Sequence, residues 1–267
     1  MDLGVRDQGY LIVGGTAGIG LAAAAVLAAD GARVAIAGRD GDRAKHAALL
    51  IEAESGQVPV VLLGDIGRPD DAERLVVEGA DALGDLAGVA VTAGGGRAAH
   101  STLEAATEAV WQDAFDSILM GTVRTVRAAL PRLVERGSGT IVTTAAYSIH
   151  AYHPARVPYL AMKTAIAAFT KTVAKSHGPH GVRANCVCPG AIETDGLAAM
   201  RHQIAADKGV PPEEALERYM GEIFHMDIAL GRPGRPREVG ELFALLLSPC
   251  AGYLNGAVIN IDGGTDF

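Results

Sequence analysis

Short runs of β-branched and other apolar residues alternate with longer stretches rich in alanine and leucine along almost the whole chain. The short runs predict seven strands, at Tyr10–Val13, Arg33–Ala37, Val58–Leu63, Gly88–Thr92, Thr140–Thr144, Arg183–Cys188 and Val258–Ile261. The longer stretches predict six helices, at Ile19–Ala29, Arg43–Glu54, Asp70–Leu83, Trp111–Glu135, Tyr159–His177 and Arg237–Leu247. Strand–helix alternation is typical of parallel sheets, and uninterrupted apolar strands fit a sheet that is buried on both faces. The sequence therefore predicts an α/β fold with a doubly wound, seven-stranded parallel sheet between two helical layers.

One long segment, Ala191–Arg235, interrupts the alternation. It holds no predicted strand, and it contains several charges and prolines. Long insertions in compact domains are often lids or binding loops, and this one follows a strand at the end where open α/β sheets bind ligands. A chain of 267 residues is at the upper end of one large domain. We therefore expect a single domain over residues 1–267, with a substrate lid at about 191–235.

Charge and cysteine content narrow the class of protein. The chain has 31 acidic and 23 basic residues and a net charge of −8, which argues against a nucleic-acid partner. Its three cysteines are few and odd in number, which argues against a disulfide framework. Cys186 and Cys188 lie two apart in an apolar run, so we expect both to face the same side of a strand as buried thiols. No further ligand lies near them in sequence, and no metal site is predicted.

No targeting or membrane-spanning segment is predicted. The first apolar run, Tyr10–Val13, is much shorter than the apolar core of a signal peptide, and no run approaches the length of a membrane span. We expect a cytoplasmic protein without a membrane partner.

A glycine-rich loop, Val13–Gly20, joins the first predicted strand to the first helix. Gly14 permits a sharp turn, Gly18 lets backbone approach a pyrophosphate, and Gly20 lets the helix pack on the sheet. The free N–H groups of the helix N-terminus would then bind the anion. A strand before the loop and a helix after it predict a dinucleotide site of the Rossmann type, although a plain glycine-rich turn is the alternative.

The end of the second strand bears on the choice of cofactor. An acid at this place binds the ribose hydroxyls of NAD, whereas an arginine accommodates the 2′-phosphate of NADP. Gly38 occupies the usual place of the acid and Arg39 follows it, which favours NADP(H). Asp40 would repel a phosphate, and Arg39 has the alternative of being a solvated residue, so NAD(H) stays open.

Tyr159 and Lys163 are four residues apart in a predicted helix and share one of its faces. A tyrosine has an ordinary pKa near 10 and is a poor acid–base catalyst at neutral pH. A neighbouring ammonium stabilises the phenolate and lowers that pKa. The pair suits proton transfer to a carbonyl oxygen.

These motifs occur together, in order and over essentially the whole chain, and in this combination the sequence resembles the short-chain dehydrogenase/reductase family in its compact form. Further matching elements are Gly64–Ile66 after the third strand, Ala93–Gly94 after the fourth, Asn185–Gly190 with Thr194, and the C-terminal Asp262–Gly264.

The resemblance implies a role for each matched residue. Tyr159 would exchange a proton with the substrate oxygen, and Lys163 would tune Tyr159 and bind the nicotinamide ribose. Asp65 and Ile66 would contact the adenine ring, Ala93 and Gly94 would line the cofactor channel, and the residues after the sixth strand would hold the nicotinamide. The cofactor-binding residues implied are Gly14, Thr16, Gly18, Ile19, Gly20, Arg39, Asp65, Ile66, Ala93, Gly94, Tyr159, Lys163, Pro189, Gly190, Ile192 and Thr194. Family members are usually tetramers or dimers built through long helices, here Trp111–Glu135 and Tyr159–His177.

The sequence departs from the family at two catalytic positions. The family's serine lies thirteen residues before the tyrosine, where this chain has Ala146, and its active-site asparagine is replaced by Ile118. Ser148 is the hydroxyl that we expect to replace the serine, with an ordinary loop serine as its alternative. Thr144 is less favourable because it lies earlier on the strand.

Other polar and aromatic residues lie near the expected site. The residues His150, Tyr152, His153 and Arg156 precede the tyrosine and are candidates for binding a substrate oxygen or acid, or for being solvated loop residues. The apolar residues of the lid would cover a substrate or pack the lid onto the domain; they are Met200, Tyr219, Ile223, Phe224 and Met226, beside His225.

The sequence thus predicts an NADP(H)-dependent oxidoreductase that interconverts a carbonyl and a secondary alcohol by hydride transfer, with Tyr159, Lys163 and Ser148 as catalytic residues. Its partners would be a small-molecule substrate and further copies of itself, as a homotetramer or homodimer. The alternative is a non-catalytic or regulatory nicotinamide-nucleotide-binding protein on the same fold.

Overall fold

The structure, a computed structural model, describes residues 2–94, 101–216, 218 and 227–265. Its centre is a seven-stranded parallel sheet with the order β3-β2-β1-β4-β5-β6-β7, which confirms the predicted fold class. Each predicted strand is present, with ends that differ from the prediction by two residues at most. The strands are β1 (Gly9–Val13), β2 (Arg33–Gly38), β3 (Val60–Leu63), β4 (Gly88–Val91), β5 (Gly139–Thr144), β6 (Val182–Pro189) and β7 (Val258–Ile261).

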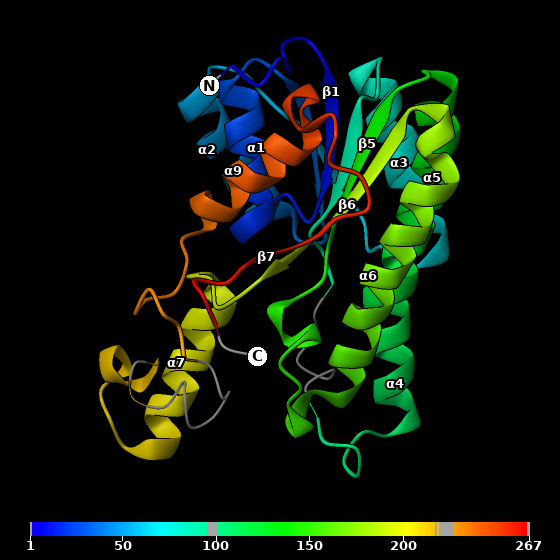
Figure 1. Ribbon diagram of the computed structural model, residues 1–267. Coiled ribbons are helices and arrows are strands. Elements are labelled where there is room, and N and C mark those ends of the chain that lie inside the picture. The colour runs from blue at the N-terminus through cyan, green and yellow to red at the C-terminus, as the bar shows by residue number, and fades with distance from the viewer. Residues whose placement is uncertain (1, 95–100, 217, 219–226, 266–267) are drawn as a thin grey trace.

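Helices cover both faces of the sheet. Figure 1 shows α1 (Gly18–Ala29), α2 (Gly41–Ser55) and α9 (Pro236–Leu247) on one side, and α3 (Pro69–Leu83), α5 (Gly121–Glu135) and α6 (Val157–His177) on the other. Because side chains alternate along a strand, Tyr10 and Ile12 of β1 join the core under α1 and α9. Leu11 and Val13 join the core under α3 and α5.

The long helix predicted at Trp111–Glu135 has three parts. It begins earlier, as α4 (Glu108–Ala114), then passes through a π-helical turn at Phe115–Met120 and continues as α5. Thr107 caps its N-terminus, since its Oγ1 accepts the N–H of Val110 at 3.4 Å. Periodicity cannot reveal a π turn, because one extra residue shifts the apolar face without ending it.

The segment predicted as a lid contains helix α7 (Asp195–Lys208) and a helical stretch at 212–216. Figure 1 shows α7 beyond the carboxyl ends of the strands, away from the helical layers. An isolated bridge between Ile192 and Gly234 joins the two ends of this segment, and another between Ile228 and Thr265 ties it to the C-terminal residues.

Among the described residues, no helix combines the length and the apolar character that crossing a membrane would require.

Candidate active site

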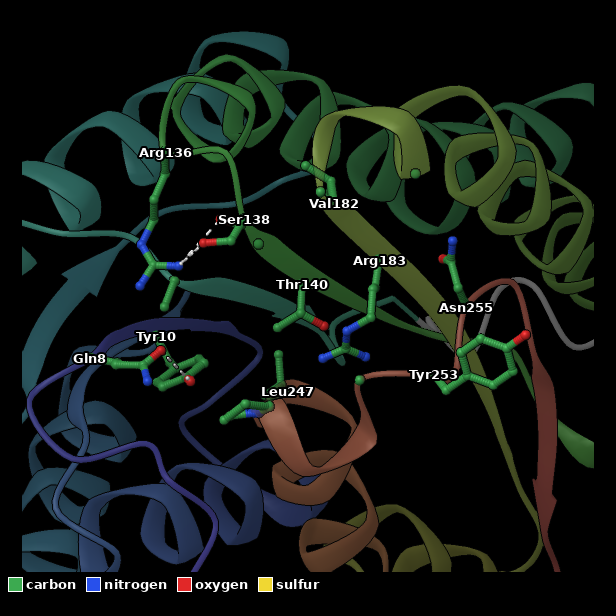
Figure 2. A pocket seen from close by; sticks show the side chains of 16 residues that line it. Gln8, Tyr10, Arg136, Ser138, Thr140, Val182, Arg183, Leu247, Tyr253 and Asn255 are labelled. Carbon is green, nitrogen blue, oxygen red and sulfur yellow. Dashed lines mark hydrogen bonds between the residues drawn. The ribbon is translucent and has the colours of Figure 1, made fainter.

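Two hollows are candidates for a ligand site, and they lie at opposite edges of the sheet. One, of about 790 Å³, is at the amino ends of β1, β5 and β6, as Figure 2 shows. Its basic side chains are already engaged. Arg183 donates to the carbonyls of Leu246, Ser248 and Leu254, at 3.1, 2.9 and 3.2 Å. Arg136 donates to the Asp85 carboxylate at 3.0 and 3.1 Å. None of the predicted catalytic or cofactor-binding residues lines this hollow, so it is not the predicted site.

The second hollow, of about 570 Å³, lies at the carboxyl ends of β1, β2, β3 and β4. Parallel α/β sheets bind nucleotides at this edge. Seven of the predicted cofactor residues line it: Gly14, Thr16, Arg39, Asp65, Ile66, Ala93 and Gly94. Its lining also includes residues that the sequence analysis did not select, namely Arg43, Thr92, Asp113 and Ser117. Of these four, Arg43 could have been found from the sequence, because it lies in the first helical turn after Asp40, close to the end of the second strand.

The glycine-rich loop has a shape that side chains would destroy. Gly14 has φ +91, and a Cβ there would lie 2.5 Å from the backbone nitrogen of Ala93. A Cβ at Gly20 would lie 2.2 Å from the Gly14 carbonyl oxygen. The loop is followed by α1, whose first residues Gly18, Ile19 and Gly20 leave backbone N–H groups at the carboxyl edge of the sheet. The loop therefore fits a dinucleotide pyrophosphate.

The ribose end of the hollow has no room for an acid at position 38. A Cβ at Gly38 would lie 2.4 Å from Oγ1 of Thr16, so Thr16 itself excludes a larger residue there. The Asp40 carboxylate accepts the N–H groups of Asp42 and Arg43, each at 3.0 Å, and caps α2. The hydrogen bond from Arg43 is the main cause that lowers the pKa of Asp40. Arg39 contacts Asp65 at 3.5 Å and remains mostly exposed.

The residues after β6 lie near the loop but are not among those that line the hollow. A Cβ at Gly18 would lie 3.1 Å from Cγ2 of Thr194, so Thr194 covers the loop. Gly190 is packed on the C-terminal residues, where a Cβ would lie 2.7 Å from Cα of Asp262. Ile192 is buried and bridges to Gly234, and Pro189 ends β6.

Tyr159 and Lys163 lie on successive turns of α6. Lys163 is 2% exposed, its Nζ donates to the Thr144 carbonyl at 2.9 Å, and it lies 5.7 Å from the centre of the Tyr159 ring. Burial raises the pKa of Tyr159 to about 12, and the positive charge of Arg156 opposes this. Burial lowers the pKa of Lys163 to about 8, against the effect of Cys186 and Cys188. The pair can exchange a proton with a ligand oxygen if the ammonium stabilises the phenolate.

The two hydroxyl residues near Ala146, where the family has its serine, differ in whether their side chains form hydrogen bonds. Thr144 donates its Oγ1 to the Val91 carbonyl at 2.8 Å, so it is bound within the sheet. Ser148 lies in a 3₁₀ turn at Tyr147–Ile149 and is fully buried, and its Oγ has no hydrogen-bond partner among the described residues. Ala146 is buried beside it.

Ile118 makes the surroundings of the pair apolar. It lies in the π-helical turn, is fully buried, and packs with Ile166, Cys186 and Cys188 against the partly buried Tyr159. Both cysteines are buried free thiols on one face of β6, as predicted. The hydrogen bond between them lowers the pKa of Cys186 and raises that of Cys188. Cys250, in contrast, is exposed.

The polar residues before Tyr159 fall into two groups: some are exposed to solvent, and others lie at the start of a helix or turn. Tyr152 is 76% exposed, and His150 is exposed as well. His153 accepts the N–H of Ala155 at 3.1 Å and caps the 3₁₀ turn Pro154–Arg156. Arg156 forms the N-cap of α6.

Tyr147 is a residue of this site that the sequence analysis did not select. It packs under the expected lid with a cluster that includes Met200; burial raises the pKa of its hydroxyl, and the positive charge of Arg156 opposes this. Tyr147 could have been found from the sequence, because it directly follows Ala146, the position of the family's catalytic serine. The other lid residues named from the sequence, Tyr219, Ile223, Phe224, His225 and Met226, lie outside the described residues.

The profile of one protein family matches residues 14–266 of the chain. This family is described as enoyl-(acyl carrier protein) reductase. The chain is 30% identical to 2-(S)-hydroxypropyl-CoM dehydrogenase 3 of Xanthobacter autotrophicus, over 97% of each chain. It is 29% identical to dehydrogenase/reductase SDR family member 4 of Sus scrofa, over 98% of this chain and 88% of the relative.

Solved structures of similar fold include enzymes with bound NADPH. The L-sorbose reductase of Gluconobacter frateurii, complexed with NADPH and L-sorbose, superposes with a TM-score of 0.92 at 27% identity, over 99% of this chain and 98% of that one. A variant of actinorhodin polyketide ketoreductase with NADPH gives a TM-score of 0.87 at 27% identity, over 96% of both chains.

Proposed function

This chain belongs to the short-chain dehydrogenase/reductase family, and from that premise we propose that it is an NADP(H)-dependent enzyme in which Tyr159 is the acid–base catalyst. The coarser activity, oxidation and reduction between a carbonyl and an alcohol, is supported by the family and by the NADPH-bound reductases of the same fold. The observation that carries the proposal is the pairing of Tyr159 with the enclosed Lys163 on successive turns of α6.

The chemistry of the pair follows from its surroundings. In reduction, the phenol of Tyr159 would give its proton to the substrate oxygen, and the ammonium of Lys163 would stabilise the phenolate that remains. A bound nicotinamide would supply the hydride. The apolar enclosure by Ile118 strengthens the attraction between ammonium and phenolate, because charges interact more strongly where water is excluded. Ser148 remains our proposed hydroxyl donor to the substrate oxygen.

A preference for NADP(H) is supported by the ribose end of the hollow. Thr16 and Gly38 leave no space for the acid that binds a free ribose, while Arg39 and Arg43 line the hollow. Asp40 is turned into the N-terminus of α2, where the helix dipole offsets its negative charge. A 2′-phosphate would therefore meet two arginines.

Three further parts of the proposal concern the whole protein. We propose that residues 191–235 form a substrate lid within one domain over residues 1–267, and that the chain assembles as a homotetramer or homodimer through α4–α5 and α6. A cytoplasmic location remains a prediction from the sequence.

The proposal is tested first by titrating the purified protein with NADPH and NADH and following cofactor fluorescence. We expect NADPH to bind about tenfold more tightly or better, and tighter binding of NADH would overturn the assignment of Arg39. A panel of ketones and secondary alcohols is then assayed with the preferred cofactor.

Substituting the tyrosine tests the catalytic role. Tyr159→Phe should lower kcat by about 10²- to 10⁴-fold and leave the affinity for NADPH nearly unchanged. Substantial turnover by Tyr159→Phe would contradict the role of this residue. Tight NADPH binding by the wild type without turnover across a broad panel would favour the non-catalytic, regulatory alternative.

A further inference from the structure

The two arginines that line the ribose end of the cofactor hollow are each paired with a carboxylate from another part of the chain. Arg39 lies 3.5 Å from the Asp65 carboxylate, which follows β3. The Nη2 atom of Arg43 lies 3.7 Å from Oδ2 of Asp195, the first residue of α7. A phosphate bound by these arginines would therefore meet both carboxylates, one of which belongs to the segment that we propose as the lid.

The start of α7 lies over the glycine-rich loop, and a contact independent of the ion pair shows this. Asp195 directly follows Thr194, the N-cap residue of α7. A Cβ at Gly18, the first residue of α1, would lie only 3.1 Å from Cγ2 of Thr194. Arg43 lies in the first turn of α2. The pair with Asp195 therefore joins α7 to α2 across the hollow, beside the loop that fits the pyrophosphate.

The pair between Arg43 and Asp195 is one that a stronger ligand can break. The side chain of Arg43 is 53% exposed and that of Asp195 83% exposed, and exposed ion pairs contribute little to stability. A 2′-phosphate carries a charge of about −1.5 to −2 near neutral pH, and its oxygens match the planar N–H groups of a guanidinium. The phosphate would thus take Arg43 from Asp195, and the carboxylate would remain beside it as a like charge.

We propose that Asp195 is a cofactor-selecting residue, whose carboxylate competes with the 2′-phosphate of NADP(H) for Arg43 and so moderates the preference for NADP(H) over NAD(H). The inference rests on the proposed function and adds a residue that determines its cofactor specificity. NAD(H) has a free hydroxyl at this position and leaves the ion pair intact, whereas NADP(H) has to break it. Binding of NADP(H) would therefore also free the first turn of α7 from α2.

Cofactor titrations test the inference without any need for a substrate. The Kd values of NADPH and NADH are measured by cofactor fluorescence for the wild type and for Asp195→Asn, and the ratio of Kd for NADH over Kd for NADPH is compared. Asp195→Asn should raise this ratio by about 2- to 5-fold, the range for an exposed ion pair, through tighter binding of NADPH. The Kd of NADH should stay nearly unchanged, which also shows that the variant is folded.

Two comparisons separate the ion pair from a general effect of charge. Asp207→Asn removes the same charge from an exposed position in the last turn of α7, where Asp207 accepts a hydrogen bond from Gln203 at 2.9 Å, and it should leave the ratio unchanged. In an Arg43→Gln background, Asp195→Asn should change the ratio by less than in the wild type, because only the repulsion of the phosphate remains. At about 0.5 M salt the effect in the wild-type background should shrink as well.

The inference and the proposed function can fail separately in this experiment. An unchanged ratio in Asp195→Asn, an equal rise in Asp207→Asn, or an equal change with and without Arg43 would each overturn the role of Asp195. A protein that prefers NADPH but shows one of these results keeps its proposed function. A wild type that binds NADH more tightly would overturn the assignment to NADP(H), whereas a ratio that still rises in Asp195→Asn would support the competition for Arg43.

Discussion

Burial acts on the two central residues in opposite directions. It favours the neutral form of each, which raises the pKa of Tyr159 to about 12 and lowers that of Lys163 to about 8. The ammonium of Lys163 donates one hydrogen bond to the Thr144 carbonyl, and Cys186 and Cys188 only partly oppose the effect of burial on its pKa. A proton on Lys163 therefore costs stability in the free protein and becomes valuable only when a phenolate or another anion is near it.

The free energy of unfolding should depend on pH through Lys163. Below pH 8 both states hold its proton. Between about 8 and the ordinary value of 10.5, the unfolded chain keeps a proton that the folded protein has released, so stability rises with pH. From pH 7 to 9.5 this term amounts to about 2 kcal/mol.

Urea denaturation of the wild type and of Lys163→Met at these two pH values, without cofactor, measures that term as the difference between their pH responses. Cys186 titrates in the same range and Lys163 helps to lower its pKa, so both proteins also carry Cys186→Ala; the other titrating groups are common to both. Identical responses would mean that the pKa of Lys163 is close to its ordinary value.

The two hydroxyls near the missing serine should differ in what their removal costs. Ser148→Ala should lower kcat far more than Thr144→Ala, because Oγ of Ser148 has no partner among the described residues whereas Thr144 is bound to Val91. Thr144→Ala should instead lower the free energy of unfolding by about 1 kcal/mol or more, since it leaves a buried carbonyl without its donor. Steady-state kinetics and denaturation of both variants check this, and equal, small effects on kcat would exclude both residues from the serine's role.

At the scale of elements, the connection between β1 and α1 depends on how closely backbone can approach backbone. Gly14 and Gly20 face each other, and Thr92, directly after β4, closes the same space. α1 also lies close to α9, where a Cβ at Gly240 would be 2.7 Å from the backbone carbon of Ala22. The N-terminus of α1 is thus held in place by small residues on two sides.

Gly20→Ala tests this arrangement. The added methyl would lie 2.2 Å from the Gly14 carbonyl oxygen, so the loop has to shift. We expect a loss of about 1–3 kcal/mol in stability, as for other overpacked sites, and a large loss of NADPH affinity. Gly41→Ala is the matched control, because its methyl would find nothing closer than Leu63 at 3.5 Å. Full NADPH affinity in Gly20→Ala would refute the assigned role of the loop.

At the scale of the whole molecule, the amino and carboxyl ends of the parallel strands differ in the groups that they offer to a ligand. The hollow at the amino edge has its arginines engaged with backbone carbonyls and an aspartate, whereas the carboxyl edge gathers the glycine-rich loop and the ends of four strands. The outward face of α6 carries small, exposed residues, Ala161, Thr164, Ala168 and Thr172. Such a face lets another helix approach closely, which supports the proposed assembly.

Ala168→Arg should therefore reduce the size of the assembly. The long side chain would separate the two helices and bury a charge between them. Sedimentation velocity should show a smaller species than the wild type, while Ala53→Arg, at an exposed position of α2, should leave the size unchanged. A wild type that sediments as a monomer would refute the proposed oligomer, and an unchanged assembly in Ala168→Arg would exclude this face.

The sequence by itself determined the succession of strands and helices along the chain, the glycine-rich loop and the spacing of Tyr159 and Lys163. These features depend on local periodicity and on contacts between near neighbours. Only the tertiary structure decided that Thr16 excludes an acid at Gly38, that Thr144 is bound to Val91, and that Tyr147 packs with Ile204 and Ala205 of α7. Each of these is a contact between side chains or backbone brought together by folding. The π-helical turn at Ile118 was equally hidden, since it alters the direction of side chains without altering the pattern of apolar residues.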